Sequence, residues 1–534
     1  MARTGRGFEV GLRDPAKASL RSIVFLAFFS CLPSGWASLP AVRLDSIYPP
    51  SASRGTEQEV IIKGVDLEFV SWMRFSREGI RARVKKDEDG DAVPNAFVVT
   101  VDQEVPVGIH KVRVGGPKFG ASNCRSFVVS DLPEVAAGTD NRTREKAFEV
   151  KLGSTVYGKA FAGGYSWFRF SAEKGQRILG ESEVDDFDTK FLPSLALFDS
   201  EGGEVLTVPQ GNVLDFIAPS QGEWYVRLSD FLYKGGADYV YRLTLSTRPH
   251  IDLVFPPVGK PGTTGEFTLL GRNLPGGHPS PWKTRHGQML EQKTVRIRLP
   301  DRDSPVVFGS SGHSDLRSGL LDHFEYREKS RNGISNAAFL AYASEPIIYE
   351  RADDLESSSE DQRISFPCAF VGKFFPYADK DRLRFSAKKG EVLHMEVFSE
   401  RLGCSSHVLM LVERITRDDD GTETFSEIGR SVETGALLGE DFYNSATREP
   451  SQVFDVSTRD PNYRLEVPED GEYRVVLYDL FNGGVPNPLN VYCLCIRKIH
   501  PGYYLTSYNL LPPKAIDYKW AAYVKSPTIR NGEI

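Results

Sequence analysis

The stretch LDSIYPPSASRGTEQEVIIKGVDL (residues 44–67) occurs twice in this 534-residue chain. Its second copy is IDLVFPPVGKPGTTGEFTLLGRNL (residues 251–274), which aligns along the whole stretch without a gap. An internal repeat of this kind indicates a duplicated structural unit, so we expect a new unit to begin near residues 41 and 251. The identical positions are Asp45/Asp252, Pro49/Pro256, Pro50/Pro257, Gly55/Gly262, Thr56/Thr263, Glu59/Glu266, Gly64/Gly271 and Leu67/Leu274.

The composition is typical of a protein built from many short strands. Aromatic residues make up 11% of the chain, and 48 glycines and 33 prolines supply turns between strands. Charged residues make up 26%, with a formal net charge of -7. A mildly acidic chain lacks the clustered Lys and Arg that neutralise phosphates, so we expect no nucleic-acid partner. The length predicts about three or four domains.

The N-terminus is typical of an export signal, which we predict over residues 1–38. Basic residues precede the apolar run 23–29, and small residues follow, with cleavage expected after Ala37. The run is shorter than the roughly 20 apolar residues that span a bilayer. Cys31 follows Phe-Phe-Ser, a poor match to a lipoprotein site. We therefore expect an exported protein of the periplasm, cell surface or extracellular space, without a transmembrane segment after signal removal.

Residues 39–132 show strands at short, regular spacing. The opening strand ends at Pro49-Pro50, since proline cannot donate to a sheet ladder. Alternating apolar positions predict the strands 42–48, 59–64, 72–75, 96–101, 108–114 and 124–129. This spacing favours an immunoglobulin-like sandwich. The motifs Asp-x-Ile-Tyr-Pro-Pro (45–50), Gly-Thr (55–56), Gly-x-x-Leu (64–67) and Val-Pro-x-Gly-x-x-x-Val-x-Val (105–114) resemble an IPT/TIG domain, an immunoglobulin-like module of extracellular bacterial proteins and others.

Residues 133–250 follow a second pattern. In the run GEWYVRLSD (222–230), Trp224, Val226 and Leu228 fall on one face of a strand. With FRFSAEKGQ (168–176) and LALFDSEGG (195–203), this run resembles the bacterial pre-peptidase C-terminal domain. The resemblance implies a jelly-roll-like β-sandwich of the kind often appended to secreted peptidases.

The second half of the chain repeats this plan. Residues 251–347 are expected to form a second IPT/TIG-like sandwich, and residues 348–500 a second pre-peptidase C-terminal-like sandwich, carrying LRFSAKKGE (383–391) and GEYRVVLYD (471–479). The predicted fold class is therefore all-β, with tandem sandwiches, immunoglobulin-like alternating with jelly-roll-like, in the order A-B-A-B.

Three segments fall outside the repeated pattern. Residues 275–313 are expected to form a long loop with one strand, and residues 351–363 a charged, solvated linker. The tail 501–534 is of the kind that leads into a further β domain in proteins resembling this one. A shortened family member and a truncated reading frame both remain open.

The sequence carries none of the common catalytic motifs. There is no HExxH, GxSxG, Walker or GxGxxG motif. The run GSSGH (309–313) places serines beside His313, but sequence neighbours rarely assemble a nucleophile and its base, so a loop tip is the better interpretation. We predict no enzyme, no catalytic or cofactor-binding residues, and no cofactor.

Two acidic clusters have a composition compatible with calcium. One is DDFD (185–188); the other runs from Thr416 to Gly421 and continues to Glu427 with EF-hand-like spacing. Thr416 stands where an acid is needed, and strand-like flanks favour a solvated hairpin loop for the second. We predict no metal-binding residues.

The resemblance to the second module adds one point about calcium. Some domains of that family bind calcium through an acidic stretch before the first core strand. The first copy lacks acids at 163–166, whereas the second keeps Asp379 and Asp381, so a calcium role shared by both copies is not expected.

Five cysteines would remain after cleavage of the leader. The odd number excludes complete pairing, and one disulfide in the last third, involving Cys368 or Cys404, is a plausible arrangement. Cys493 and Cys495 fall on the same face of a strand and are expected to pack as small apolar residues. The fifth is Cys124.

Surface features offer weaker leads. Asn141-Arg142-Thr143 matches the short glycosylation sequon. Tyr165, Trp167 and Trp282 could form a platform for a sugar or polymer; core packing is the better interpretation of Trp167, while Trp282 is expected in a polar loop.

The function predicted from these features is that of a non-catalytic binding or scaffold protein, which contacts protein or polysaccharide through its sandwich loops. The alternative is an accessory, non-catalytic region of a secreted peptidase or other hydrolase. A hydrolase using the 275–313 loop is the weakest hypothesis. The oligomeric state stays open.

Overall fold

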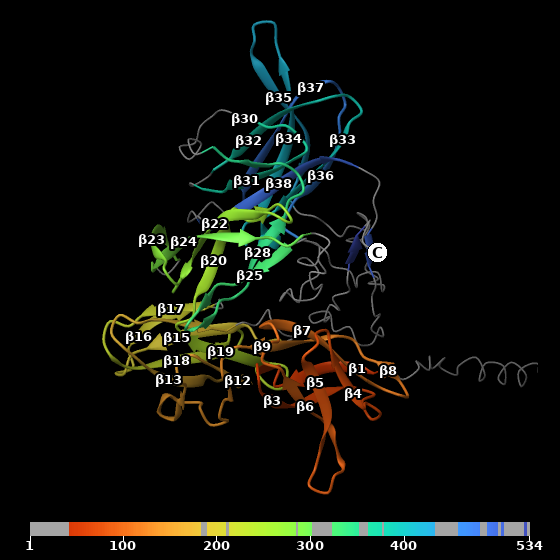
Figure 1. Cartoon of the computed structure of the whole chain (residues 1–534). Coiled ribbons are helices and arrows are strands. Elements are labelled where there is room, and N and C mark those ends of the chain that lie inside the picture. Colours follow the sequence, from red (N-terminus) through yellow and green to blue (C-terminus); the bar gives the residue numbers. More distant parts are fainter. Residues whose placement is uncertain are drawn as a thin grey trace, which may run out of the picture. The chain divides into compact units, whose positions relative to one another are not determined.

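The computed structural model describes residues 42–182, 189–209, 213–284, 287–301, 323–351, 361–375, 379–432, 458–480, 487, 489–499, 504–506 and 528–530. The predicted signal peptide lies outside these residues. Figure 1 shows strands and their connections throughout the described chain, which confirms the all-β class of tandem sandwiches. Within this part of the chain, no helix has the length and apolar character required to cross a membrane.

The first A sandwich comprises two sheets. The first has the order β1 (Arg43–Tyr48), β3 (Glu57–Val65), β6 (Ala92–Val101), β5 (Ile80–Lys86). The second has the order β2 (Ser51–Ser53), β9 (Arg125–Ser130), β7 (Gly108–Gly116), β4 (Trp72–Phe75), with β8 (Gly120–Ala121) paired to β7. Their inner faces share one apolar core.

The first B sandwich has two five-stranded sheets. One has the order β10 (Glu134–Ala136), β12 (Ser154–Lys159), β19 (Val240–Ser246), β14 (Arg177–Glu181), β17 (Val213–Ile217). The other has the order β11 (Phe148–Glu149), β13 (Ser166–Ala172), β18 (Gly222–Asp230), β15 (Pro193–Phe198), β16 (Glu204–Val208). A short 3₁₀ helix, η1 (Arg144–Lys146), precedes β11.

The second A sandwich repeats the first in outline. Its first sheet has the order β20 (His250–Phe255), β22 (Thr264–Arg272), β24 (Met289–Arg298), β23 (His278–Lys283). The described part of its second sheet has the order β21 (Val258–Gly259), β28 (Ala338–Tyr342), β25 (His323–Tyr326), and a small ladder joins β26 (Lys329–Ser330) to β27 (Gly333–Ile334).

The second B sandwich repeats the strand order of the first. One sheet has the order β29 (Ile347–Tyr349), β31 (Cys368–Lys373), β38 (Val491–Lys498), β33 (Val392–Phe398), β36 (Asn462–Glu466). The other has the order β30 (Gln362–Arg363), β32 (Asp381–Ala387), β37 (Gly471–Asp479), β34 (Val408–Arg417), β35 (Glu423–Ser431). A 3₁₀ helix, η3 (Glu400–Leu402), follows β33, and β39 (Tyr504–Thr506) pairs with β40 (Thr528–Arg530).

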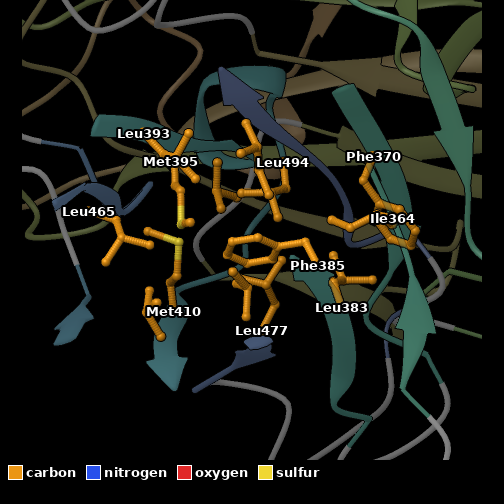
Figure 2. Close-up of a cluster of buried hydrophobic side chains, with 14 of the residues drawn as sticks. Ile364, Phe370, Leu383, Phe385, Leu393, Met395, Met410, Leu465, Leu477 and Leu494 are labelled. Carbon is orange, nitrogen blue, oxygen red and sulfur yellow. The ribbon is translucent and has the colours of Figure 1, made fainter. Parts of the chain in front are cut away.

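The core of the second B sandwich shows how both of its sheets contribute. In Figure 2, Met395 and Leu494 from one sheet and Phe385, Met410 and Leu477 from the other point toward a common centre. All five side chains are almost completely removed from solvent. Burial of apolar surface on this scale, at roughly 25 cal/mol per Å², is the main force that holds the two sheets together.

The repeated glycine of the opening stretch marks a close backbone contact. A Cβ atom on Gly64 would lie 1.8 Å from the carbonyl oxygen of Arg43, and one on Gly271 would lie 2.1 Å from that of His250. A β-bulge interrupts the same ladder at the equivalent place in both copies, between β1 and β3 and between β20 and β22. The glycine is retained because any side chain would meet main-chain atoms of the first strand.

A repeated asparagine, which follows a serine in both copies, bonds the same strand from a connecting segment. The side-chain oxygen of Asn123 accepts from the amide of Leu44 at 2.8 Å, and its amide nitrogen donates to the Leu44 carbonyl at 2.9 Å. Asn336 makes the same two bonds to Ile251 at the same distances. Each asparagine side chain therefore makes the two hydrogen bonds that a neighbouring strand would otherwise make to one residue of the opening stretch. These bonds satisfy buried backbone groups.

Three expectations from the sequence are corrected. The segment 275–313 contains two strands rather than one: β23 and β24 pair in a hairpin, while residues 302–322 lie outside the description. The segment 351–363 ends in strand β30, because Gln362 pairs with Leu383. The suggested disulfide is wrong, since all five described cysteines are free.

The cysteine pair of β38 follows the prediction. Cys493 and Cys495 are both buried, and their sulfur atoms lie 4.0 Å apart within an apolar cluster. They therefore pack as small apolar residues on one face of the strand.

Replacing Gly64 with alanine tests the close contact in the A sandwich. We expect a loss of about 1–3 kcal/mol of stability or more, because the added methyl group meets fixed backbone atoms. Gly222→Ala is the matched control: its Cβ would have no neighbour within 4 Å, and its backbone does not require glycine. Denaturant unfolding of both variants measures the difference, and equal unfolding curves would contradict the role of the contact.

Candidate functional site

The two B sandwiches can be compared position by position through their ladders. Ser166 pairs with Leu228 at the start of β13, and Asp381 pairs with Leu477 at the start of β32. In the other sheet, Gly158 faces Tyr241 in the first copy and Gly372 faces Tyr492 in the second. These matching registers assign equivalent residues to the two copies.

The outer face of the sheet β11-β13-β18-β15-β16 gathers aromatic residues in the first copy. Trp167 on β13 lies directly across from Arg227 on β18, and Phe198 on β15 lies across from Tyr225. The rings of Trp167 and Phe198 are 5.1 Å apart. Trp167 remains half-buried, so part of its ring meets solvent. We define the aromatic face by Tyr165, Trp167, Phe198, Tyr225, Arg227 and Tyr233.

Arg227 lies at the centre of the aromatic face. Its guanidinium carbon is 4.7 Å from the ring centre of Tyr165, 5.8 Å from that of Trp167 and 4.9 Å from that of Phe198. Stacking on ring faces attracts a cation electrostatically and restricts its side chain. The guanidinium is thus held in place mainly by aromatic rings.

Tyr233 extends the aromatic face through the loop that follows β18. The buried carboxylate of Asp230 fixes this loop, because one of its oxygens accepts from the amides of Leu232 at 3.0 Å and Lys234 at 2.9 Å. Tyr233 has a φ of 55°, a left-handed conformation that is uncommon for a bulky residue. The residue is 54% exposed.

The exposed Tyr233 belongs to the aromatic face through its contact with Tyr165. The two ring centres lie 6.1 Å apart in an edge-to-face arrangement. A hydrogen bond with Tyr165 raises the pKa of the Tyr233 hydroxyl. The fold therefore holds an exposed aromatic ring in a costly backbone conformation, which is an arrangement found at binding sites.

At the equivalent positions of the same outer face, the second copy carries four charged residues and a valine. Lys380, Arg382, Glu413, Arg474 and Val476 occupy the positions of Tyr165, Trp167, Phe198, Tyr225 and Arg227. Arg474 and Glu413 form an ion pair at 2.6 Å. The inner faces share the same plan, while at these outer positions the grouping of Trp167, Phe198 and Tyr225 around Arg227 is found in the first copy. The outer face of the second copy has Phe425 and Tyr478 instead, with the Arg474 guanidinium 3.6 Å from the ring centre of Phe425 and Lys380 Nζ 5.2 Å from that of Tyr478.

The second copy has a different feature, a group of three carboxylates. Glu350 follows β29, while Asp379 precedes β32 and Asp381 begins it, and their oxygen atoms lie within 4.8 Å of one another. Hard cations such as calcium prefer several converging oxygens of this kind. Burial, with Asp381 and Glu350 nearby, raises the pKa of the Tyr492 hydroxyl well above its ordinary value. These three carboxylates could therefore hold a divalent cation.

The equivalent positions in the first copy do not suit a cation. The registers place Ala137, Gly164 and Ser166 where the second copy has Glu350, Asp379 and Asp381. Burial is the main cause that raises the pKa of Tyr241, the counterpart of Tyr492, to about 12. The sequence pointed to Asp379 and Asp381 but missed Glu350, because Glu350 joins them only through the parallel pairing of β29 with β31.

Other residues suggested by the sequence are placed elsewhere. Trp282 lies in strand β23 rather than a polar loop, and its half-buried ring packs 4.9 Å from that of Phe375, so the expectation of a loop platform there is wrong. Asn141 is 1% exposed and donates to the Trp167 carbonyl at 3.2 Å, which leaves its sequon inaccessible. The Thr416–Gly421 segment spans a hairpin turn between β34 and β35.

The remaining suggestions do not form a site in the described chain. Glu427 makes a two-point ion pair with the neighbouring Arg430 at 2.6 and 2.7 Å, and so is not directed toward the acidic turn. The clusters 185–188 and 309–313 lie outside the described residues.

Comparisons with known proteins give only distant similarities. No family model matches the chain, and no curated protein matches it. Among solved structures, the pre-peptidase C-terminal domain of a Bacillus anthracis collagenase is similar at 11% identity and a TM-score of 0.17, covering 26% of this chain and 97% of that one.

Two further solved structures cover more of this chain. The Bacteroides ovatus protein SGBP-B, solved with a mixed-linkage heptasaccharide, is similar at 10% identity and a TM-score of 0.15, over 85% of this chain and 74% of that one. The tandem CBM22 domains of Paenibacillus barcinonensis Xyn10C are similar at 9% identity and a TM-score of 0.14, over 84% of this chain and 99% of that one. All three TM-scores are low, so nothing about the ligand of this chain follows from them.

Calcium titration tests the carboxylate group of the second copy. We expect calcium to raise the unfolding temperature of the protein, and Asp379→Asn to abolish that rise. Without calcium, the same substitution should leave stability unchanged or increase it, because it relieves repulsion between like charges. Asp418→Asn, in the exposed hairpin turn, is the control and should keep the full response. Identical calcium responses of the wild type and Asp379→Asn would show that these carboxylates hold no calcium.

Proposed function

We propose that this chain is an exported, non-catalytic binding protein of the periplasm or cell surface that holds a polysaccharide against the aromatic face of its first B sandwich. The observation that carries the proposal is the row of Trp167, Tyr165 and Tyr233, supported by a rigid sheet and a fixed loop. The proposed division into four sandwiches, 39–132, 133–250, 251–347 and 348–500, makes the other three the scaffold that presents this face.

The chemistry of sugars favours this ligand. A pyranose ring presents C–H groups on its faces and hydroxyl groups around its edge, so it can pack on an aromatic ring while its hydroxyls stay hydrated. Tyr and Trp suit such contacts because each combines a large apolar ring with a polar group. Exposed rings held in place lose little conformational entropy on binding, and this favours affinity for a weakly apolar ligand.

Absence of enzymatic activity is part of the proposal and rests on the sequence, which carries none of the common hydrolase motifs. The alternative, an accessory region of a secreted hydrolase, would use the same face for the same ligand. A binding experiment on this face therefore tests the shared part of both hypotheses.

Substituting Trp167 with alanine is the direct test. Affinity electrophoresis through gels containing neutral and acidic polysaccharides should show retention of the wild-type chain by at least one polymer. We expect Trp167→Ala and Tyr233→Ala each to weaken that retention about tenfold, equivalent to ~1.4 kcal/mol. Arg382→Ala, at the position of Trp167 in the second copy, is the matched control and should bind as the wild type does. Equal retention of all four proteins, or no retention in any gel, would refute the proposal.

A further inference from the structure

The charge at the centre of the aromatic face narrows the class of ligand. Arg227 carries a guanidinium with five N–H donors in a planar fork. Within the described residues, Glu204 is the one carboxylate within 4.0 Å of it, at 3.7 Å, which is beyond hydrogen-bond distance. No hydrogen bond from the Arg227 guanidinium to a described residue is found, so its donors remain available to a ligand.

Arg169, on the same face, makes a useful contrast. Its guanidinium lies 2.7 Å from Glu149 and 3.4 Å from Glu223, and so is engaged by two carboxylates. Arg144, stacked over Tyr225, donates to the backbone carbonyls of Asp199 and Ser200. Of these three arginines, Arg227 alone is positioned by rings rather than by acceptors.

On this basis, and resting on the proposed function, we infer that the polysaccharide bound at the aromatic face is an acidic one, whose carboxylate or sulfate groups pair with Arg227 while its sugar rings pack on Trp167 and Tyr233. A planar guanidinium matches the two oxygens of a carboxylate or sulfate and bonds them in pairs. The rings that hold Arg227 restrict its side chain before binding, so less entropy is lost when the pair forms.

Glu204 is the residue of this chain that would compete with an acidic ligand for Arg227. It is half-exposed on strand β16, which β15 separates from the β18 strand of Arg227, and among the described residues its carboxylate is the nearest negative charge to Arg227. A ligand carboxylate must therefore displace a weak, solvated pair, which is worth little in water. Removal of Glu204 should strengthen binding of an acidic polymer, and a gain of binding cannot arise from misfolding.

Affinity electrophoresis of the full chain with a matched pair of polymers tests the inference. Dextran and dextran sulfate share one backbone and differ in charge, and polygalacturonate supplies carboxylate in place of sulfate. We expect retention by one or both acidic polymers, weakened by added NaCl as screening increases. Arg227→Gln should weaken this retention about tenfold or more, as expected for loss of a hydrogen-bonded charge pair, and Glu204→Gln should strengthen it severalfold.

The controls separate this inference from the proposed function. Arg169→Gln removes an equal charge from the same face and should change retention less than twofold, because Arg169 is already paired with two carboxylates. If Arg169→Gln and Arg227→Gln weaken retention equally, the effect depends on net charge alone and the inference is overturned. Retention by neutral polymers that Arg227→Gln leaves unchanged would overturn the acidic ligand and keep polysaccharide binding. No retention by any polymer would overturn both. Sulfate and carboxylate specificity are distinguished by which acidic polymer is retained.

Discussion

Each A sandwich depends on one close approach between two strands of its first sheet. β1 pairs with β3, and β20 with β22, at a bulge beside Gly64 or Gly271, whose missing side chain leaves room for a carbonyl oxygen that a methyl group would overlap. Asn123 or Asn336, in the segment that leads into β9 or β28, then bonds the same strand. These two contacts hold the opening strand in place, and in the first A sandwich its Leu44 and Ile47 side chains are part of the apolar core. Among the identical residues of the repeat, Gly64/Gly271 is the pair whose missing side chain permits this close approach.

The inner faces of the B sandwiches also contain a close contact that only glycine permits. In both copies a glycine of one strand lies beneath a buried tyrosine of the next, and a Cβ at Gly158 or Gly372 would lie 2.4 or 2.5 Å from the hydroxyl of Tyr241 or Tyr492. Packing at this density tolerates little change. The outer faces carry no such restriction, and there the copies differ: the second has Arg382, Glu413 and Arg474 at the positions of Trp167, Phe198 and Tyr225.

The sequence predicts the fold well because the repeat and the alternation of apolar residues report directly on the inner faces of strands. It predicts the sites poorly, for two physical reasons. Trp282 stands between Pro281 and Lys283 in a segment rich in turn residues, yet a ladder with β24 makes the segment a strand. Glu350 lies 29 positions before Asp379, and only the pairing of β29 with β31 brings it near. Both depend on contacts between segments far apart, which local patterns do not contain.

The same reasoning explains why the sequence favours core packing for Trp167. A tryptophan that alternates with Phe168 and Phe170 in a strand is ambiguous until it is known which face of the sheet is covered. The structure buries the two phenylalanines and leaves Trp167 on the outer side with Arg227. A sheet face that only contacts water can carry pairs of charged residues, as the second copy does with Arg474 and Glu413. In the first copy the same positions hold aromatic residues, of which Trp167 and Tyr225 are only half-buried, and this apolar surface is what the proposed ligand would cover.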